Sequence, residues 1–257
     1  MNKLLVTSNK SESNSLGLDS DSQSSEFYKR GFATVRRNQY KIDRKFWEEI
    51  GKLNSNLNNF ESKEKNAGSL TLYNEIYNQN HELFVNYLFD TGLLGELFQI
   101  VGMPLYLTNY VHLLTLQSCP ELSWHRDTHL YTGSVVGNIP PVIKLIIYGS
   151  EVKSGNSGEF EILTGTNRFD LHSQWFDNLL SLSRFRKYSF LGNIGDCLVF
   201  DSSAIHRRCR THYRASRSAT IYGFVTAKWQ QKAYFNNHMP IIDFYKKKLE
   251  SLFQDSL

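Results

Sequence analysis

The stretch Trp124–Asp127 carries an imidazole and a carboxylate two residues apart, at His125 and Asp127. Side chains alternate faces along an extended segment, so both groups point to the same side of the chain. With one more imidazole from a distant segment they could hold a divalent metal on one face and leave the other face open. Two histidines and one carboxylate are the ligand set of non-heme Fe(II) oxygenases. An ordinary polar pair on a strand would give the same pattern, so the assignment depends on the rest of the chain.

A histidine and an arginine further along the chain extend this pattern. The run Gly195–Phe200 predicts a turn leading into a buried strand, and His206 follows it as the candidate third ligand, with His212 as the alternative. Arg217 opens an otherwise apolar strand, where a guanidinium is costly to bury unless an anion meets it. The planar fork of a guanidinium matches a carboxylate. A structural ion pair is the alternative reading of Arg217.

Composition and charge bound the class of protein. The 257 residues suffice for one large domain or two small ones, and 40% hydrophobic with 14% aromatic residues can form a sizeable core. The net charge of +4 does not by itself favour nucleic acid or a membrane as partner. Cys119, Cys197 and Cys209 lack close CxxC spacing, which argues against a disulfide framework or a zinc knuckle. Free thiols suit a reducing compartment, so we expect a cytoplasmic protein.

The N-terminal residues differ in composition from the rest of the chain. Residues 1–25 are rich in Ser, Asn and Asp and contain no long apolar run. This composition predicts a disordered tail and argues against a signal peptide or a transmembrane helix. We expect residues 26–257 to form a single domain.

The first part of that domain carries helical patterns. Phe27–Val35 indicates a helix end, a glycine and a short strand. Asp43 can cap a helix whose apolar side chains recur at helical spacing, at Phe46, Trp47, Ile50, Leu53 and Leu57. From Leu83 to Val101 we expect two short helices, broken near Gly92 and ended by Gly102. These helices are expected to be scaffold.

After Pro104, short runs rich in β-branched and aromatic residues alternate with clusters of Gly, Pro, Asn and Ser. The runs are Tyr106–Asn109, Val111–Gln117, Val142–Tyr148, Phe160–Leu163, Cys197–Phe200 and Thr220–Val225. This pattern is typical of an antiparallel sandwich or barrel. A helical insert near His172–Leu182 interrupts the strands, and an amphipathic helix over Ile241–Phe253 follows them. Helices first and strands after, without βαβ alternation, predict an α+β fold that is mainly antiparallel β.

Several motifs, taken in order, resemble the phytanoyl-CoA dioxygenase family of Fe(II)- and 2-oxoglutarate-dependent oxygenases. They are His125-x-Asp127, GEFEILTGTNR at residues 158–168, GDCLVF at residues 195–200, His206 and Arg217. The family typically has a segment resembling NGPLxxxPGSH before its distal histidine. This chain departs from it, with Ser157-Gly158 in place of Asn-Gly and Thr164-Gly165-Thr166-Asn167 where Pro-Gly-Ser-His is usual. The resemblance covers about residues 26–226.

The resemblance implies a double-stranded β-helix, a cupin-like jelly roll with flanking helices. It implies His125, Asp127 and His206 as ligands of Fe(II), and Arg217 as the partner of the distal carboxylate of 2-oxoglutarate. The implied reaction consumes O2 and 2-oxoglutarate, releases succinate and CO2, and oxidises an unactivated C–H bond. The expected substrate is a small-molecule metabolite or a carrier-bound acyl group. Relatives that halogenate lack the carboxylate ligand, so Asp127 favours hydroxylation, or a related desaturation or ring closure, over halogenation.

Further residues are candidates for contacts near the metal. Gln117 stands where the family often places a polar cosubstrate contact. Lys144 is a candidate cosubstrate contact because it lies in an apolar strand, where a buried ammonium would need a carboxylate. An outward-pointing, solvated Lys144 is the alternative. Trp124, Arg126 and His129 flank the metal pair and are candidate substrate contacts, with Trp124 as a core residue the alternative.

Two loops follow the candidate ligands. Arginines are concentrated after His206, at Arg207, Arg208, Arg210, Arg214 and Arg217. They could form a cradle for an anionic substrate or a solvated basic loop. The Gly- and Pro-rich connection Thr132–Pro141 is the candidate lid, because water exclusion requires one.

Two other functions are compatible with the same core. The enzyme could act on nucleic acid or protein, but the arginine cluster is the one feature in favour, and aromatic residues interleaved with basic ones are not evident. A non-catalytic β-barrel that keeps the ligand set as a binding module is the third reading. The intact His, Asp, His and Arg positions favour an enzyme over this module.

Overall fold

The computed structural model describes residues 20–41, 43–57, 65–66, 69–72, 75–127, 142–155, 157–169, 185–226 and 239–254. The helices of these residues are α1 (Ser20–Arg30), α2 (Arg44–Leu57), α3 (Glu75–Asp90), α4 (Leu93–Val101), η1 (Thr166–Arg168) and α8 (Met239–Gln254). The strands are β1 (Phe32–Val35), β2 (Lys65–Asn66), β3 (Ser69–Leu72), β4 (Tyr106–Thr115), β5 (Ile143–Tyr148), β6 (Phe160–Leu163), β7 (Lys187–Phe190), β8 (Cys197–Asp201), β9 (His206–Arg208) and β10 (Arg217–Val225).

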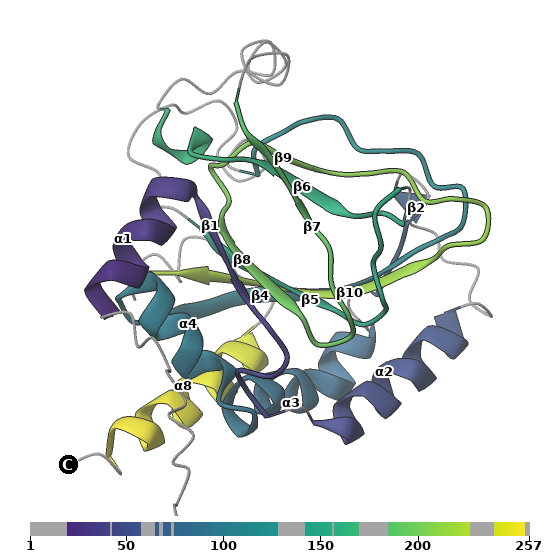
Figure 1. Cartoon of the computed structure of the whole chain (residues 1–257). Coiled ribbons are helices and arrows are strands. Elements are labelled where there is room, and N and C mark those ends of the chain that lie inside the picture. The colour runs from purple at the N-terminus through teal and green to yellow at the C-terminus, as the bar shows by residue number, and fades with distance from the viewer. Residues whose placement is uncertain are drawn as a thin grey trace, which may run out of the picture.

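The strands form two antiparallel sheets that face each other (Figure 1). The larger sheet has the order β1-β8-β5-β10-β4-β3-β2, and the smaller has the order β7-β6-β9. The segment 122–125 continues the smaller sheet beyond β9, because Leu122 N–H donates to the carbonyl of Arg208 at 2.9 Å and His125 N–H to that of His206 at 3.0 Å. This is the predicted double-stranded β-helix, present in the described residues as two separate sheets and not as a closed barrel.

Hydrophobic side chains cover both faces of the larger sheet. On β5, Leu145 and Ile147 join the core between this sheet and the helices, whereas Ile146 and Tyr148 join the core between the two sheets. A strand that is buried on both faces carries a nearly continuous apolar run. Lys144 is the exception on β5, and it lies on the face that points toward the smaller sheet.

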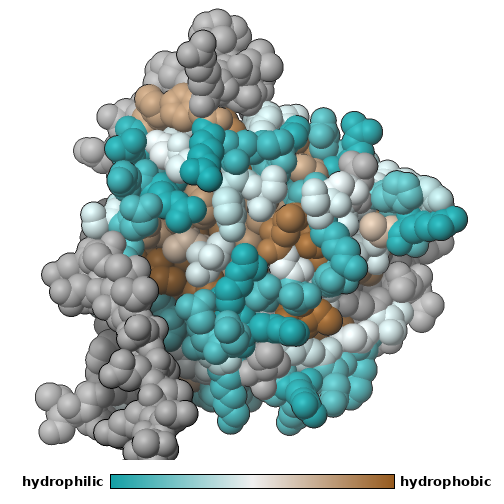
Figure 2. Space-filling model, in the orientation of Figure 1, coloured by the Kyte–Doolittle hydropathy of each residue, from teal (hydrophilic) through white to brown (hydrophobic). Residues whose placement is uncertain are grey.

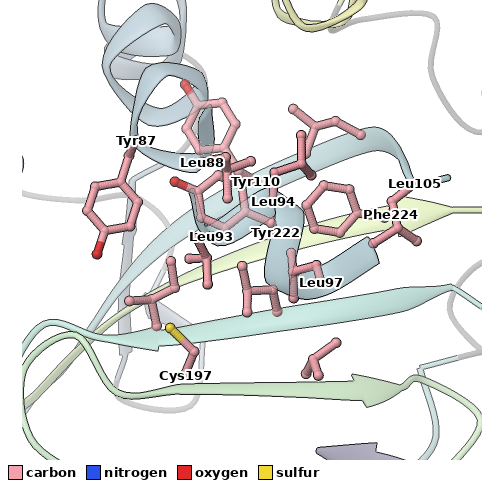
Figure 3. Packing of buried hydrophobic residues seen from close by; sticks show 14 of the residues in the cluster. Tyr87, Leu88, Leu93, Leu94, Leu97, Leu105, Tyr110, Cys197, Tyr222 and Phe224 are labelled. Atoms are coloured by element: carbon pink, nitrogen blue, oxygen red, sulfur yellow. The ribbon is translucent and has the colours of Figure 1, made fainter. Parts of the chain in front are cut away.

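Helices α2, α3, α4 and α8 lie on the side of the larger sheet away from the smaller one (Figure 1). Figure 3 shows leucines of α3 and α4 packed against Tyr222 and Phe224 of β10. Two buried hydroxyls fix the helical layer to the sheet. Tyr222 Oη donates to the carbonyl of Phe84 at 2.9 Å, and Tyr245 Oη to that of Leu105 at 2.7 Å. The outer face of the larger sheet therefore rests on a well-packed helical layer.

The helix ends expected from the sequence are confirmed. Asp43 precedes α2, and its Oδ1 accepts the N–H of Lys45 at 2.9 Å, as a capping side chain does. Helix α4 lies between Gly92 and Gly102, whose φ angles of 78° and 72° suit glycine. Helix α8 contains the predicted C-terminal helix. Helix α1 begins at Ser20, inside the stretch expected to be a tail.

The strand pattern is confirmed in outline and corrected in detail. The first two predicted runs form one strand, β4, and β10 begins at Arg217, the residue expected to open that strand. Strands β2, β3, β7 and β9 were not predicted, because they are short and β9 is the polar tripeptide HRR. The predicted insert His172–Leu182 and the predicted lid Thr132–Pro141 lie outside the described residues.

The surface is mixed in character. Figure 2 shows hydrophobic side chains near the middle of the view, in the region between the two sheets, with hydrophilic side chains around them. Among the described residues, the large apolar side chains that are exposed are those of Met103, Ile194 and Tyr213. Every helix in the described part of the chain is too short or too polar to cross a membrane.

Candidate metal centre

Strand pairing brings the candidate ligands together. His206 is the first residue of β9, and His125 lies in the segment that pairs with it. Each donates its backbone N–H to the carbonyl of the other, at 3.0 and 2.9 Å. The two imidazoles therefore lie side by side, with ring centroids 4.5 Å apart. Asp127 follows two residues after His125, and the period-two alternation turns its carboxylate to the same side.

The side-chain distances define a compact group. Nε2 of His206 lies 3.2 Å from Oδ2 of Asp127, and Nε2 of His125 lies 3.7 Å from Oδ1. One ligand atom from each of the three residues lies within 4.8 Å of the others. Within the described ranges, no other group of three His, Cys, Asp or Glu side chains is close enough to share a metal ion. The rival His212 is exposed, and its ring lies against that of Tyr213 with the two planes tilted by 46°.

Backbone carbonyls orient both imidazoles. Nδ1 of His125 lies 2.7 Å from the carbonyl of Ser123, and Nδ1 of His206 lies 2.8 Å from that of Ala204. A carbonyl oxygen only accepts, so each Nδ1 carries a proton, and in the neutral ring Nε2 then presents its lone pair toward Asp127. Burial and the neighbouring His206 lower the pKa of His125, which keeps its ring neutral near pH 7. Lone pairs and a carboxylate that face one another in this way favour a cation between them.

Lys144 of β5 joins this group. Its Nζ lies 2.7 Å from Oδ2 of Asp127, with side chains 14% and 8% exposed. Burial alone would raise the pKa of Asp127, but the ammonium of Lys144 holds that pKa well below its ordinary value. Asp127 is therefore an anion at neutral pH. Asp127 is thus the carboxylate that a buried ammonium at Lys144 requires.

The guanidinium of Arg217 is buried and only partly hydrogen-bonded by the described residues. It is 3% exposed, and its Nε and Nη2 have no hydrogen-bond partner among the described residues. Its guanidinium lies over the ring of Tyr148, with Cζ 5.1 Å from the centroid. Burial lowers the pKa of Arg217, and the nearby carboxylate of Glu159 offsets this effect only in part. Such a group is a ready site for a carboxylate.

Arg217 and the candidate ligands line the same space between the sheets. Arg217 lies on the same face of β10 as Ala219, which belongs to the core between the sheets. His206 packs on two aromatic rings of that core, Phe160 and Phe200, at centroid distances of 5.1 and 4.9 Å. The interior therefore contains a cluster of metal-ligating groups and, within the same apolar core, a guanidinium with two nitrogens that no described residue pairs.

Two of the predicted substrate contacts lie elsewhere. Arg126 is 1% exposed, and its Nη1 donates to the carbonyls of Thr166, Phe169 and Ser203 at 3.0, 3.4 and 2.5 Å. Trp124 stacks under the guanidinium of Arg207, with Cζ 4.6 Å from the ring centroid. The physical reason is the same alternation that joins His125 to Asp127, because it turns residues 124 and 126 to the opposite side. Arg126 is a structural residue, contrary to the prediction.

The remaining candidates have different positions. Gln117 is exposed in the turn after β4 and does not enter the interior, so the predicted cosubstrate contact there is corrected. The buried polar residue at this end of β4 is Thr115, 1% exposed and paired in register with Arg217. Sequence reasoning missed Thr115 because the register between β4 and β10 is a long-range property. His129 lies outside the described residues.

The arginine-rich stretch does not form one surface. Arg207 points outward, where its guanidinium lies 2.8 Å from Glu161 and 3.2 Å from Glu121. Arg208 and Arg217 are buried, whereas Arg210 and Arg214 are exposed. A continuous basic cradle is therefore not present over residues 207–217.

Comparisons with known proteins bear on the fold. Neither a protein-family model nor a curated protein matches the sequence. Among solved structures, the non-heme α-ketoglutarate-dependent carbocyclase SnoK of nogalamycin biosynthesis is similar, with a TM-score of 0.61 and 12% identity over 80% of this chain and 84% of that chain. EctD from S. alaskensis with bound Fe gives a TM-score of 0.63 and 15% identity over 80% and 76%.

A third similar structure contains several ligands. HygX from Streptomyces hygroscopicus, with nickel, 2-oxoglutarate and hygromycin B bound, gives a TM-score of 0.59 and 17% identity over 80% of this chain and 87% of that chain. At these identities the likeness establishes the fold alone, and that fold is the one used by non-heme Fe- and 2-oxoglutarate-dependent oxygenases. The narrower resemblance to the phytanoyl-CoA dioxygenase family stays a prediction.

Proposed function

We propose that this protein is an Fe(II)- and 2-oxoglutarate-dependent oxygenase that oxidises a C–H bond of a small molecule. The observation that carries the proposal is the convergence of His125, Asp127 and His206 in an interior that also holds Arg217, two of whose guanidinium nitrogens have no hydrogen-bond partner among the described residues. Proteins of the same fold support it, since EctD has been crystallised with Fe and HygX with nickel and 2-oxoglutarate.

The donor set fits a ferrous ion. Two neutral imidazoles and one carboxylate form a facial triad that leaves adjacent coordination positions open. The carbonyls of Ser123 and Ala204 fix both rings, so the Nε2 lone pairs are oriented before any ion arrives. With the ion and 2-oxoglutarate bound, such a centre activates O2, converts the 2-oxo acid to succinate and CO2, and removes a hydrogen atom from the substrate.

The interior also fits 2-oxoglutarate. Arg217 offers Nε and Nη2 to its distal carboxylate, and a charge-assisted pair of this kind is bidentate. Thr115, opposite Arg217 in the β4–β10 register, offers a hydroxyl from the same face. The apolar rings of Phe160 and Phe200 around His206 keep water from this part of the interior. The chain would thus bind and orient 2-oxoglutarate and exclude water from it.

The distribution of arginines favours a small molecule over nucleic acid as substrate. Arg210 and Arg214 are the exposed members of the stretch 207–217, and Arg207 is neutralised by two glutamates. Binding of a single strand requires a basic groove with stacking aromatic side chains. Structures of HygX and EctD contain hygromycin B and 5-hydroxyectoine, both small molecules. The same distribution of arginines also weakens the argument for an anionic substrate, because these side chains do not form one basic surface.

The retained carboxylate at Asp127 limits the reaction class. Halogenating relatives need a vacancy at this ligand, so hydroxylation is proposed, with desaturation or ring closure as related outcomes of hydrogen removal.

The free, buried cysteines at 119, 197 and 209 fit a reducing compartment. We infer a cytoplasmic location from them.

Succinate formation tests the proposal. The purified protein, given Fe(II), 2-oxoglutarate and O2, should form succinate even without a substrate. Such centres still decarboxylate 2-oxoglutarate slowly when no substrate is oxidised. Asp127→Ala should abolish this activity, whereas Asp90→Ala, an exposed carboxylate on α3, should not. Absence of succinate under all metal and pH conditions would favour the non-catalytic binding module.

A further inference from the structure

The ammonium of Lys144 lies inside the group of candidate metal ligands. Its Nζ is 2.7 Å from Oδ2 of Asp127, and the same oxygen is 3.2 Å from Nε2 of His206. Asp127 contributes the negative charge among the three candidate ligands. A fixed cation therefore already neutralises the charge that would attract a metal ion.

The sheet holds Lys144 in this position. Strand β5 is an inner strand, and its register places Lys144 between Gly223 of β10 and Phe200 of β8. The side chain is 14% exposed, so most of it is removed from water. The strand is paired on both sides, so the backbone of Lys144 is fixed and the side chain starts from the inner face of the sheet, within reach of Asp127. A metal ion that enters the site therefore meets this ammonium.

Counting charges shows the effect of this ammonium on ligand binding. Asp127 and Lys144 cancel, and the imidazoles bind metals in their neutral form. A divalent ion alone then brings two uncompensated positive charges into a largely buried site, which is unfavourable. The two carboxylates of 2-oxoglutarate, one of them directed at Arg217, bring negative charge that offsets the ion and the buried guanidinium together. Without the ammonium, Asp127 would offset half of the charge of the ion before the cosubstrate arrives.

We propose that Lys144 couples the two ligands, so that the metal ion binds weakly alone and tightly together with 2-oxoglutarate. This inference rests on the proposed function. Lys144 acts through Asp127 and through its charge, and it is a positioning residue without contact to the reacting atoms. The protein would then retain iron chiefly when its cosubstrate is abundant, which limits idle reaction of the metal with O2.

Calorimetric titration with Ni(II), with and without saturating 2-oxoglutarate, measures the coupling. The ratio of the two dissociation constants is the factor by which cosubstrate strengthens metal binding. Lys144→Met removes the charge at similar length, so it should tighten the binding of Ni(II) alone and reduce the factor by about tenfold. Lys144→Gln keeps a hydrogen-bond donor without the charge and should behave like Lys144→Met. Lys153→Met, at a side chain 71% exposed, is the matched control and should change neither constant.

The outcomes separate this inference from the proposed function. If 2-oxoglutarate strengthened Ni(II) binding by the same factor in both Lys144 variants as in the unaltered protein, the role of Lys144 in the coupling would be refuted. A factor lost in Lys144→Met but kept in Lys144→Gln would refute the electrostatic basis and assign Lys144 a hydrogen-bonding role. Ni(II) binding that is indifferent to His206→Ala would instead overturn the proposed function. If Lys144→Met does not fold, Lys144→Gln alone decides between these results.

Discussion

Replacing Arg217 with methionine should stabilise the ligand-free protein and weaken its binding of 2-oxoglutarate. The guanidinium is 3% exposed, and two of its nitrogens have no hydrogen-bond partner among the described residues. Methionine fills a similar volume without burying a charge, so we expect a gain in unfolding free energy of about 1–3 kcal/mol. For a chain of this size, each kcal/mol raises the melting temperature by roughly 2–4 °C.

The loss in cosubstrate affinity follows from the same two nitrogens. A hydrogen bond to a charged group contributes about 1.5–3 kcal/mol, so losing two should cost at least about 3 kcal/mol. That corresponds to roughly a 100-fold higher dissociation constant. Thermal denaturation of the ligand-free variant and calorimetric titration of its Ni(II) complex with 2-oxoglutarate measure the two effects. A structural arginine would not give this opposite pair of changes.

Arg126 provides the matched control. It is also buried, but its guanidinium donates to the carbonyls of Thr166, Phe169 and Ser203. Arg126→Met should therefore lower the melting temperature and leave the binding of 2-oxoglutarate by the folded protein unchanged. If Arg217→Met also lowered the melting temperature and bound 2-oxoglutarate normally, the assignment of Arg217 to the cosubstrate would be refuted.

Three further predictions concern other residues. His206→Ala should abolish metal-dependent succinate formation with an unchanged circular dichroism spectrum, and retained activity would remove His206 from the ligand set. Burial lowers the pKa of His112 to about 4, so between this value and its ordinary 6.5 the unfolded chain binds a proton that the folded protein excludes. Stability should fall as the pH drops through this window, by up to about 3 kcal/mol, and urea denaturation of His112→Gln should show a flatter pH dependence if this is correct. Gly158→Ala places a Cβ 2.9 Å from Thr211 and 3.4 Å from Arg217 at a φ of +75°, and should weaken 2-oxoglutarate binding several-fold. Gly155→Ala has a similar φ of +91° but open space around it, so equal calorimetric losses in both variants would exclude displacement of Arg217.

Local signals in the sequence predicted much of the scaffold. The Asp43 cap and the Gly102 terminus depend on neighbouring backbone alone, so they could be placed without knowledge of the fold. The common orientation of His125 and Asp127 follows from the period of an extended chain. The same rule, applied to Arg126, would have turned that side chain away from the metal.

Long-range register determined what the sequence could not reveal. Asp127 meets Lys144 across the two sheets, because the β5–β8 register turns Lys144 inward and the pairing of His125 with His206 positions Asp127 opposite it. Thr115 faces Arg217 for the same reason, whereas Gln117, two residues further, falls in an exposed turn. A one-residue shift in either pairing would reverse these orientations. Local patterns contain no information on such registers.

The most direct test of the central claim is anomalous diffraction at the iron edge from crystals grown anaerobically with Fe(II) and 2-oxoglutarate. We expect a single strong peak within coordination distance of Nε2 of His125, Nε2 of His206 and one carboxylate oxygen of Asp127, with 2-oxoglutarate extending from it to Arg217. A peak at another position, or none between these three side chains at full iron loading, would contradict the assignment.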